Sequence, residues 1–196
     1  ANFNGSDTLT IVSRDSGGIP LSDSDTLPIT VAAVNDAPVN TVSVAQTTLE
    51  DTALVFSSAN GNALRVADVD GGTLTTVISI GNGLLSVVTG GGATVAGNGT
   101  GSVTLTGTAA QINAALDGLR YVPTADYNGS ATLTLTTSDG VAAPVVTTVG
   151  VTVSPVVDIV GDAITTNEDT AVTFNPVTGV GVGADNFEGT PQITAI

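Results

Sequence analysis

The stretch Tyr127-Asn128-Gly129-Ser130-Ala131-Thr132-Leu133-Thr134 decides the fold, because apolar and small polar side chains alternate along it after an Asn-Gly turn. Alternation with a period of two is typical of a strand that buries one face. The same register occurs 124 positions earlier in Phe3-Asn4-Gly5-Ser6, which is followed by Leu9-Thr10. Matching stretches in one register indicate a repeated structural unit.

Acidic residues recur with the same unit. Glu50-Asp51-Thr52-Ala53 returns as Glu168-Asp169-Thr170-Ala171 at an offset of 118 positions, and Asp36 returns as Asp158 at an offset of 122. The period is therefore about 120 residues, which is the size of one small domain. We expect domains in tandem, with carboxylates at the places where they meet.

The composition limits the partners of such an array. Three basic and 18 acidic residues give a formal net charge of -15, which excludes an electrostatic footprint for nucleic acid or anionic lipid. The chain has no Cys, His, Met or Trp, so disulfides and soft-ligand zinc or copper sites are excluded as well. The ligands that remain are oxygens, and these suit Ca²⁺.

The sequence shows neither a signal peptide nor an apolar run of about 18 residues, so we expect no membrane insertion. The absence of Cys does not decide between a cytosolic and an exported protein. Because the repeat starts and stops in mid-unit, we expect residues 1–34 to form the C-terminal hairpin of a first repeat, with strands at 6–14 and 26–34. We expect residues 35–155 to form a complete repeat, and residues 156–196 to form the first strands of a third, truncated one.

The complete repeat is expected to be an immunoglobulin-like or cadherin-like antiparallel β-sandwich in an all-β array. Turn residues divide it into seven expected strands, at 40–47, 52–58, 73–80, 83–89, 102–106, 131–137 and 145–154. One short helix interrupts this pattern. Thr108 and Gln111 have the spacing of a capping box, and Gly118 can end the helix in a left-handed conformation. The apolar stripe of this helix is expected to contain Ile112, Ala115, Leu116 and Leu119.

Strand direction places the acidic loops at two ends of the sandwich, because antiparallel strands alternate in direction. Asp68 and Asp70 lie two positions apart before a Gly-Gly turn, so their carboxylates can converge on one hard cation. The expected upper cluster of calcium ligands contains Asn35, Asp36, Asp68, Asp70 and Asp139. The expected lower cluster contains Glu50, Asp51 and Asp158.

Several motifs carry a family resemblance in their order and spacing. They are Glu-Asp-Thr at 50–52, Asp-Val-Asp-Gly-Gly at 68–72, the helix segment at 106–116, Tyr-Asn-Gly-Ser at 127–130, Ser-Asp-Gly at 138–140 and Val-Asn-Asp-Ala-Pro at 34–38. This order resembles the cadherin-like tandem extender repeats of giant bacterial repeats-in-toxin adhesins, which are secreted by the type I pathway. The resemblance implies an extracellular spacer on the bacterial cell surface that acts in attachment or biofilm formation, with calcium stiffening the joints between neighbouring repeats.

Other functions are weighed beside this one. Tandem loops could bind a sugar or peptide, but the chain has few aromatic residues for a carbohydrate platform, and Tyr121 and Tyr127 are expected in the core or at a corner. Paired carboxylates could act as in glycosidases, but no buried acid pair is evident, so we expect no enzyme. The repeats of a secreted toxin or an S-layer protein would share the physics of a spacer.

The terminal half-repeats predict one further partner. A lone hairpin at residues 1–34 would expose an apolar face and unpaired strand edges. We expect the C-terminal part of one molecule to pack on this hairpin in the next, which would give head-to-tail self-association.

Overall fold

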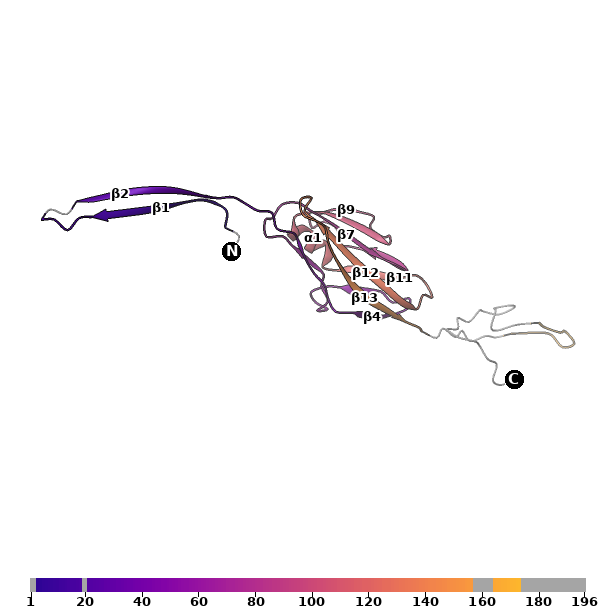
Figure 1. Ribbon diagram of the computed structural model, residues 1–196. Helices are drawn as coiled ribbons and strands as arrows, with labels where there is room; N and C mark the ends of the chain where they lie inside the picture. The colour runs from indigo at the N-terminus through magenta and orange to yellow at the C-terminus, as the bar shows by residue number, and fades with distance from the viewer. Residues whose placement is uncertain (1–2, 19–20, 157–163, 174–196) are drawn as a thin grey trace.

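The computed structural model describes residues 3–18, 21–156 and 164–173. Within these ranges the chain is mostly β-strand, arranged in several sheets with one short helix. This confirms the prediction of a β-rich, sandwich-like fold that contains one short helix (Figure 1).

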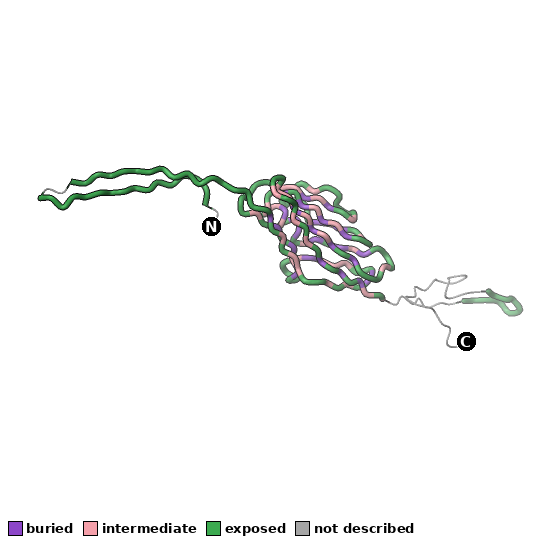
Figure 2. Tube along the Cα trace, viewed as in Figure 1, coloured by how far each residue is buried: buried purple, intermediate pink, exposed green. Residues whose placement is uncertain are grey.

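An antiparallel hairpin occupies the N-terminal part of the chain. Strands β1 (Gly5–Arg14) and β2 (Ser22–Val31) pair over ten residues each. The hairpin projects from one end of the sandwich (Figure 1), and its described residues are exposed along both strands (Figure 2). The second strand starts four residues before its predicted beginning, because the ladder opposite β1 extends to the pair of Arg14 and Ser22.

The larger layer of the sandwich is a six-stranded sheet. Its neighbours, in spatial order, are β4 (Gln46–Leu49), β13 (Val145–Ser154), β12 (Gly129–Ser138), β7 (Leu74–Ile80), β10 (Ser102–Gly107) and β9 (Thr94–Ala96). All neighbours are antiparallel except β4 and β13, which run parallel. The prediction of an antiparallel sandwich is therefore wrong at this edge, where β4 runs parallel to β13, the last strand of the unit.

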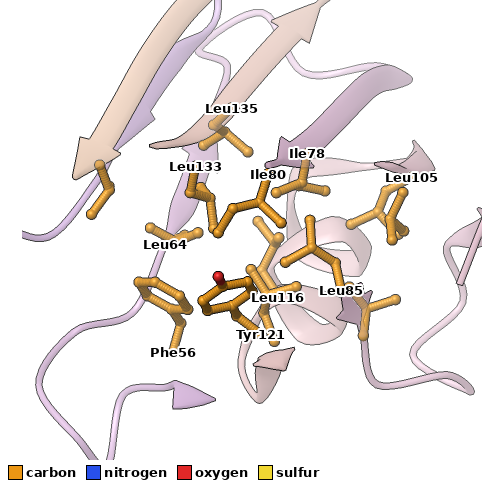
Figure 3. Close-up of a cluster of buried hydrophobic side chains, with 14 of the residues drawn as sticks. Phe56, Leu64, Ile78, Ile80, Leu85, Leu105, Leu116, Tyr121, Leu133 and Leu135 are labelled. Carbon is orange, nitrogen blue, oxygen red and sulfur yellow. The ribbon is translucent and has the colours of Figure 1, made fainter. Parts of the chain in front are cut away.

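Two smaller sheets complete the sandwich. One contains β5 (Leu54–Phe56), β11 (Leu119–Pro123) and β8 (Gly83–Ser86), in this order. The other pairs β3 (Val39–Thr41) with β6 (Arg65–Ala67). Side chains from the six-stranded and three-stranded sheets meet in one hydrophobic cluster (Figure 3).

Alternation along the strands builds this core. In β12, Leu133 and Leu135 are fully buried while the intervening Thr134 is not. Tyr121 is also buried, as predicted, and its hydroxyl donates to the carbonyl of Asn82 at 2.9 Å. A buried phenol keeps a hydrogen-bond partner in this way, so the polar tip does not oppose burial of the ring.

The helix α1 (Ala109–Leu116) begins at the predicted capping box. The Thr108 backbone N–H donates to Gln111 Oε1 at 2.8 Å, and the Gln111 N–H donates to Thr108 Oγ1 at 3.3 Å. Gly118 has φ of 114° and ends the helix as expected, so Leu119 starts strand β11 and does not belong to the helical stripe. No helix in the described part of the chain is long and apolar enough to span a membrane.

The other strand predictions err where the strands are short. Strands β6, β9 and β11 are not among the predicted strands. The first two contain only three residues each, which is too few to show a period of two. Strand β11 does alternate in burial, but its first residue, Leu119, also continues the apolar stripe expected for the helix. The expected strand at 40–47 divides into β3 and β4, and the expected strand at 52–58 shrinks to β5.

The hairpin β1–β2 and its sequence counterpart, β12–β13, differ in burial. This difference predicts that equivalent substitutions in them change the free energy of unfolding by different amounts. Leu133 is 0% exposed, whereas its counterpart Leu9 is 47% exposed. We expect Leu133→Ala to lower the free energy of unfolding by about 2–5 kcal/mol, because it leaves a cavity in the core. Leu9→Ala, the matched control, should change it by no more than about 0.5 kcal/mol in dilute solution. Urea unfolding measures both, and equal effects would contradict the assigned core.

Candidate functional site

The upper cluster lies where the linker, residues 32–38 between β2 and β3, meets the sandwich. Strand β3 directly follows the linker, and its Val39 pairs with Ala67 of β6, so the loop after β6 lies beside residues 35 and 36. The Asp36 backbone N–H donates to Asp70 Oδ2 at 2.6 Å. The Asp70 N–H donates in turn to Asp68 Oδ1 at 2.9 Å. One chain of hydrogen bonds thus joins the linker to the Asp-Val-Asp loop.

A second contact ties the linker to the end of β12. Asn35 Nδ2 donates to Asp139 Oδ2 at 2.8 Å, across 104 positions of sequence. The other carboxylate oxygen, Asp139 Oδ1, accepts the N–H groups of Val141 and Ala142, each at 2.9 Å. The hydrogen bond from Asn35 is the main cause that lowers the pKa of Asp139, and the backbone N–H groups add to it. Asp139 is therefore an ionised acceptor at neutral pH.

Two asparagines hold this end of the sandwich together. Asn40 Nδ2 donates to the carbonyls of Leu135 and Val145, at 3.1 and 3.0 Å, and so fixes β3 on the ends of β12 and β13. Asn113 Oδ1 accepts the Val66 N–H at 2.8 Å, while its Nδ2 donates to the Val66 carbonyl at 2.9 Å. The helix therefore clamps β6, the strand that leads into the Asp-Val-Asp loop.

Neither asparagine was predicted as a functional residue from the sequence, because their partners lie 47 to 105 positions away. A signal existed for Asn113. It stands inside a short helix between apolar residues, where asparagine is unfavourable unless its side chain has a specific partner. No comparable signal marks Asn40.

The structure gathers all five predicted upper residues at one end of the sandwich, but in a hydrogen-bonded arrangement. Asn35 bonds to Asp139, and Asp36 bonds to Asp70 through its backbone. Among the described residues, no three or more carboxylate, imidazole or thiol groups converge closely enough to hold a metal. The donor chemistry nevertheless fits a hard cation, since every side chain of the cluster offers oxygen.

A shallow hollow opens beside this cluster. It is lined by Phe3, which precedes β1, by Val34 and Asp36 of the linker, and by Asp70 of the Asp-Val-Asp loop. With one aromatic side chain in the wall, the hollow lacks the stacked platform that sugar-binding sites use.

The lower cluster lies at the opposite end, where β13 leaves the sheet. Glu50 is only 2% exposed; its N–H donates to the Ser154 carbonyl at 2.9 Å, and its Oε1 accepts the Val156 N–H at 2.6 Å. Asp51 has φ of 54°, and its Oδ1 accepts the Asp126 N–H at 3.4 Å. The third predicted member, Asp158, lies outside the described residues.

The Glu-Asp-Thr motif forms the same turn in both of its copies. Thr52 N–H donates to the Leu49 carbonyl at 3.3 Å, and Thr170 N–H donates to the Asn167 carbonyl at the same distance. A threonine hydroxyl closes each turn at 2.9 Å, from Thr48 to Thr52 and from Thr166 to Thr170. The central aspartates have φ of 54° and 57°. The sequence repeat is thus also a repeat of local structure.

Asp117 belongs to neither predicted cluster, and the structure gives it a structural role. It ends α1 and accepts the N–H and the hydroxyl of Ser58, at 2.7 and 2.9 Å. The backbone hydrogen bond from Ser58 is the main cause that lowers the pKa of Asp117. This contact fastens the helix end to the loop after β5.

No protein-family model matches the chain, and a search of curated proteins finds no significant match.

The Asn35 contact predicts a pKa change at the joint. We expect Asn35→Ala to raise the pKa of Asp139 toward the ordinary aspartate range, because the largest stabiliser of its charged form is removed. In the unchanged protein, this carboxylate contributes stability above its unfolded pKa, and the contribution is lost as pH falls through its lower folded pKa. NMR titration of the side-chain carboxyl carbons measures the shift. Asp117, held by Ser58, is the internal control, and an unchanged Asp139 would contradict the assignment.

The Asn113 clamp predicts a local loss of protection. Asn113→Ala leaves the Val66 N–H and carbonyl without their side-chain partner, at a cost of about 1–3 kcal/mol. Hydrogen exchange should accelerate at Val66 and Asp70, while amides between β12 and β13 keep their rates. Uniform acceleration across the sandwich would show that Asn113 supports the whole fold and does not act locally on β6.

Proposed function

We propose that this chain is a segment of a calcium-rigidified extender, built from cadherin-like, immunoglobulin-type sandwich repeats, in a large extracellular adhesin of the bacterial cell surface. In this role the repeats act as a spacer for attachment or biofilm formation and are exported by type I secretion. The family resemblance of the motifs supports the adhesin assignment. The chemistry of the joint supports the role of calcium.

One observation carries the proposal. The Asn35 side chain donates to Asp139 and the Asp36 backbone N–H donates to Asp70, so two hydrogen bonds tie the linker to two acidic loops at the same end of the sandwich. A linker that merely separates two domains needs no such contacts. Pro38, which is buried at the end of the linker, further restricts the path of the chain into β3.

Calcium fits this joint by charge and by ligand type. Ca²⁺ takes six to eight oxygen ligands in flexible geometry, and the residues that would supply them are Asn35, Asp36, Asp68, Asp70 and Asp139. The bound ion would neutralise carboxylates that repel one another in a chain of formal net charge -15. On binding, hydrogen bonds between these groups would give way to shared coordination, which removes rotational freedom from the linker.

The lower cluster would form the equivalent joint with the following repeat. Glu50, Asp51 and Asp158 are its proposed ligands, and Asp158 is the sequence counterpart of Asp36. The recurrence of the Glu-Asp-Thr turn at 168–170 supports a joint that is built in the same way from one repeat to the next.

Calcium binding gives the direct test. Titration calorimetry should detect Ca²⁺ binding, while Mg²⁺, which requires near-ideal octahedral geometry, should bind far more weakly. Asp70→Asn and Asp139→Asn should each weaken the affinity by at least about tenfold, since each removes a charged ligand. Asp7→Asn, which makes the same charge change on the hairpin, should leave the affinity unchanged.

The shape of the molecule supplies the second readout. Small-angle scattering should show a longer and less variable particle with calcium than with chelator, and the melting temperature should rise with calcium by mass action. Unchanged dimensions together with an unchanged melting temperature would remove calcium from the proposed function.

A further inference from the structure

One face of the hairpin carries apolar side chains at the positions that are buried in β12 and β13, except that Asp7 stands in place of the buried Ala131 and Asp25 stands in place of Thr147. Gly5 pairs with Val31 and Gly129 pairs with Val153, and both glycines have positive φ, at 122° and 133°. Counted from these glycine–valine pairs, apolar side chains lie on the same face of both ladders. In the sandwich they are buried, at Leu133, Leu135, Val149, Val151 and Val153. In the hairpin they are exposed, at Leu9, Ile11, Leu27, Ile29 and Val31.

Most side chains on the opposite face of the hairpin are polar, with Val12 and Pro28 as the apolar exceptions. Thr8, Thr10 and Thr26 belong to it, because their positions alternate with those of the apolar set. The hairpin therefore has the pattern of a strand pair that packs one face against a second layer. An isolated two-stranded ribbon cannot bury that face in water.

The sandwich shows which kind of segment pairs with the outer edge of such a ladder. The outer edge of β13 takes β4 as a parallel neighbour, in a register that pairs Val151 with Gln46 and Thr152 with Thr47. The position of β13 in its ladder corresponds to that of β2 in the hairpin. The outer edge of β2 can therefore pair with a parallel strand that resembles β4.

The chain carries a second segment of this kind. Residues 164–173 repeat residues 46–55, and their Glu-Asp-Thr turn has the geometry of the first copy. Two apolar side chains of this segment, Ile164 and Val172, are exposed. Their counterparts are the half-buried Gln46 and Leu54, of which Leu54 packs against the core.

We propose that residues 164–173 of a second copy of this chain add to the outer edge of the β1–β2 hairpin as a parallel strand, so that copies associate head to tail. The register follows from the sandwich: Ile29 lies opposite Ile164, and Thr30 lies opposite Thr165. The interaction is independent of calcium, so it can fail without affecting the proposed function. Because each copy carries a charge of -15, higher salt should strengthen it.

The test uses the whole chain, in chelator, across a concentration series with light scattering. The molecular mass should rise with concentration. Leu9→Asp should weaken association at least about tenfold by placing a charge on the apolar face. The control Thr10→Asp adds the same charge to the polar face and should have a much smaller effect. A strictly monomeric chain at every concentration, or equal effects of the two variants, would overturn the proposal.

Complementation tests the head-to-tail geometry. Val172→Asp should also prevent association, yet an equimolar mixture with Leu9→Asp should form a dimer and nothing larger, since one intact joint remains. Association that survives both substitutions in a single chain would overturn the proposal.

The register has its own readout, because the chain has no native cysteine. Mixed Thr30→Cys and Thr165→Cys chains should form a disulfide-linked dimer on oxidation, whereas Thr10→Cys with Thr165→Cys should not. Equal yields from both pairs would contradict the parallel register.

Discussion

The antiparallel ladder between β12 and β13 is the interaction on which the rest of this structure depends. Its inner face supplies a large share of the core, through Leu133, Leu135 and the valines of β13. Its two outer edges accept β7 and β4, so the six-stranded sheet grows from it in both directions. Its ends also position the candidate sites, since Asp139 follows β12 and Glu50 contacts the exit of β13. The hairpin β1–β2 shows the same ladder without a covering layer.

Features with a local cause could be predicted from the sequence. The alternation along β12 and β13, the capping box at Thr108 and the helix end at Gly118 each depend on neighbouring residues, and all were predicted. The grouping of Asn35 with Asp139 also followed from strand direction alone. Direction survives errors in strand boundaries, because it depends only on the end of the sandwich that each loop occupies.

Features with a distant cause could not be predicted in the same way. Short strands such as β6 and β9 exist because a neighbour offers an edge, and no local pattern marks them. The clamps made by Asn40 and Asn113 depend on partners far away in sequence. The inward position of Glu50 has the same origin. Its motif resembles a solvent-exposed acidic turn, yet its carboxylate accepts the Val156 N–H, 106 positions further along the chain.

The two ends of the sandwich differ in the exposure of their contacts, and this decides where a row of such units would bend. At the lower end a buried carboxylate holds the chain as it leaves β13, where water competes weakly for the Glu50 contact. At the upper end the contacts of Asn35 and Asp36 are exposed, and exposed hydrogen bonds contribute little because water replaces them readily. In the proposed array, bending would therefore concentrate at the linker before β3. The acidic loops around Asp70 and Asp139 lie at this same end, so a cation that joined their carboxylates would act on the softest part of the row.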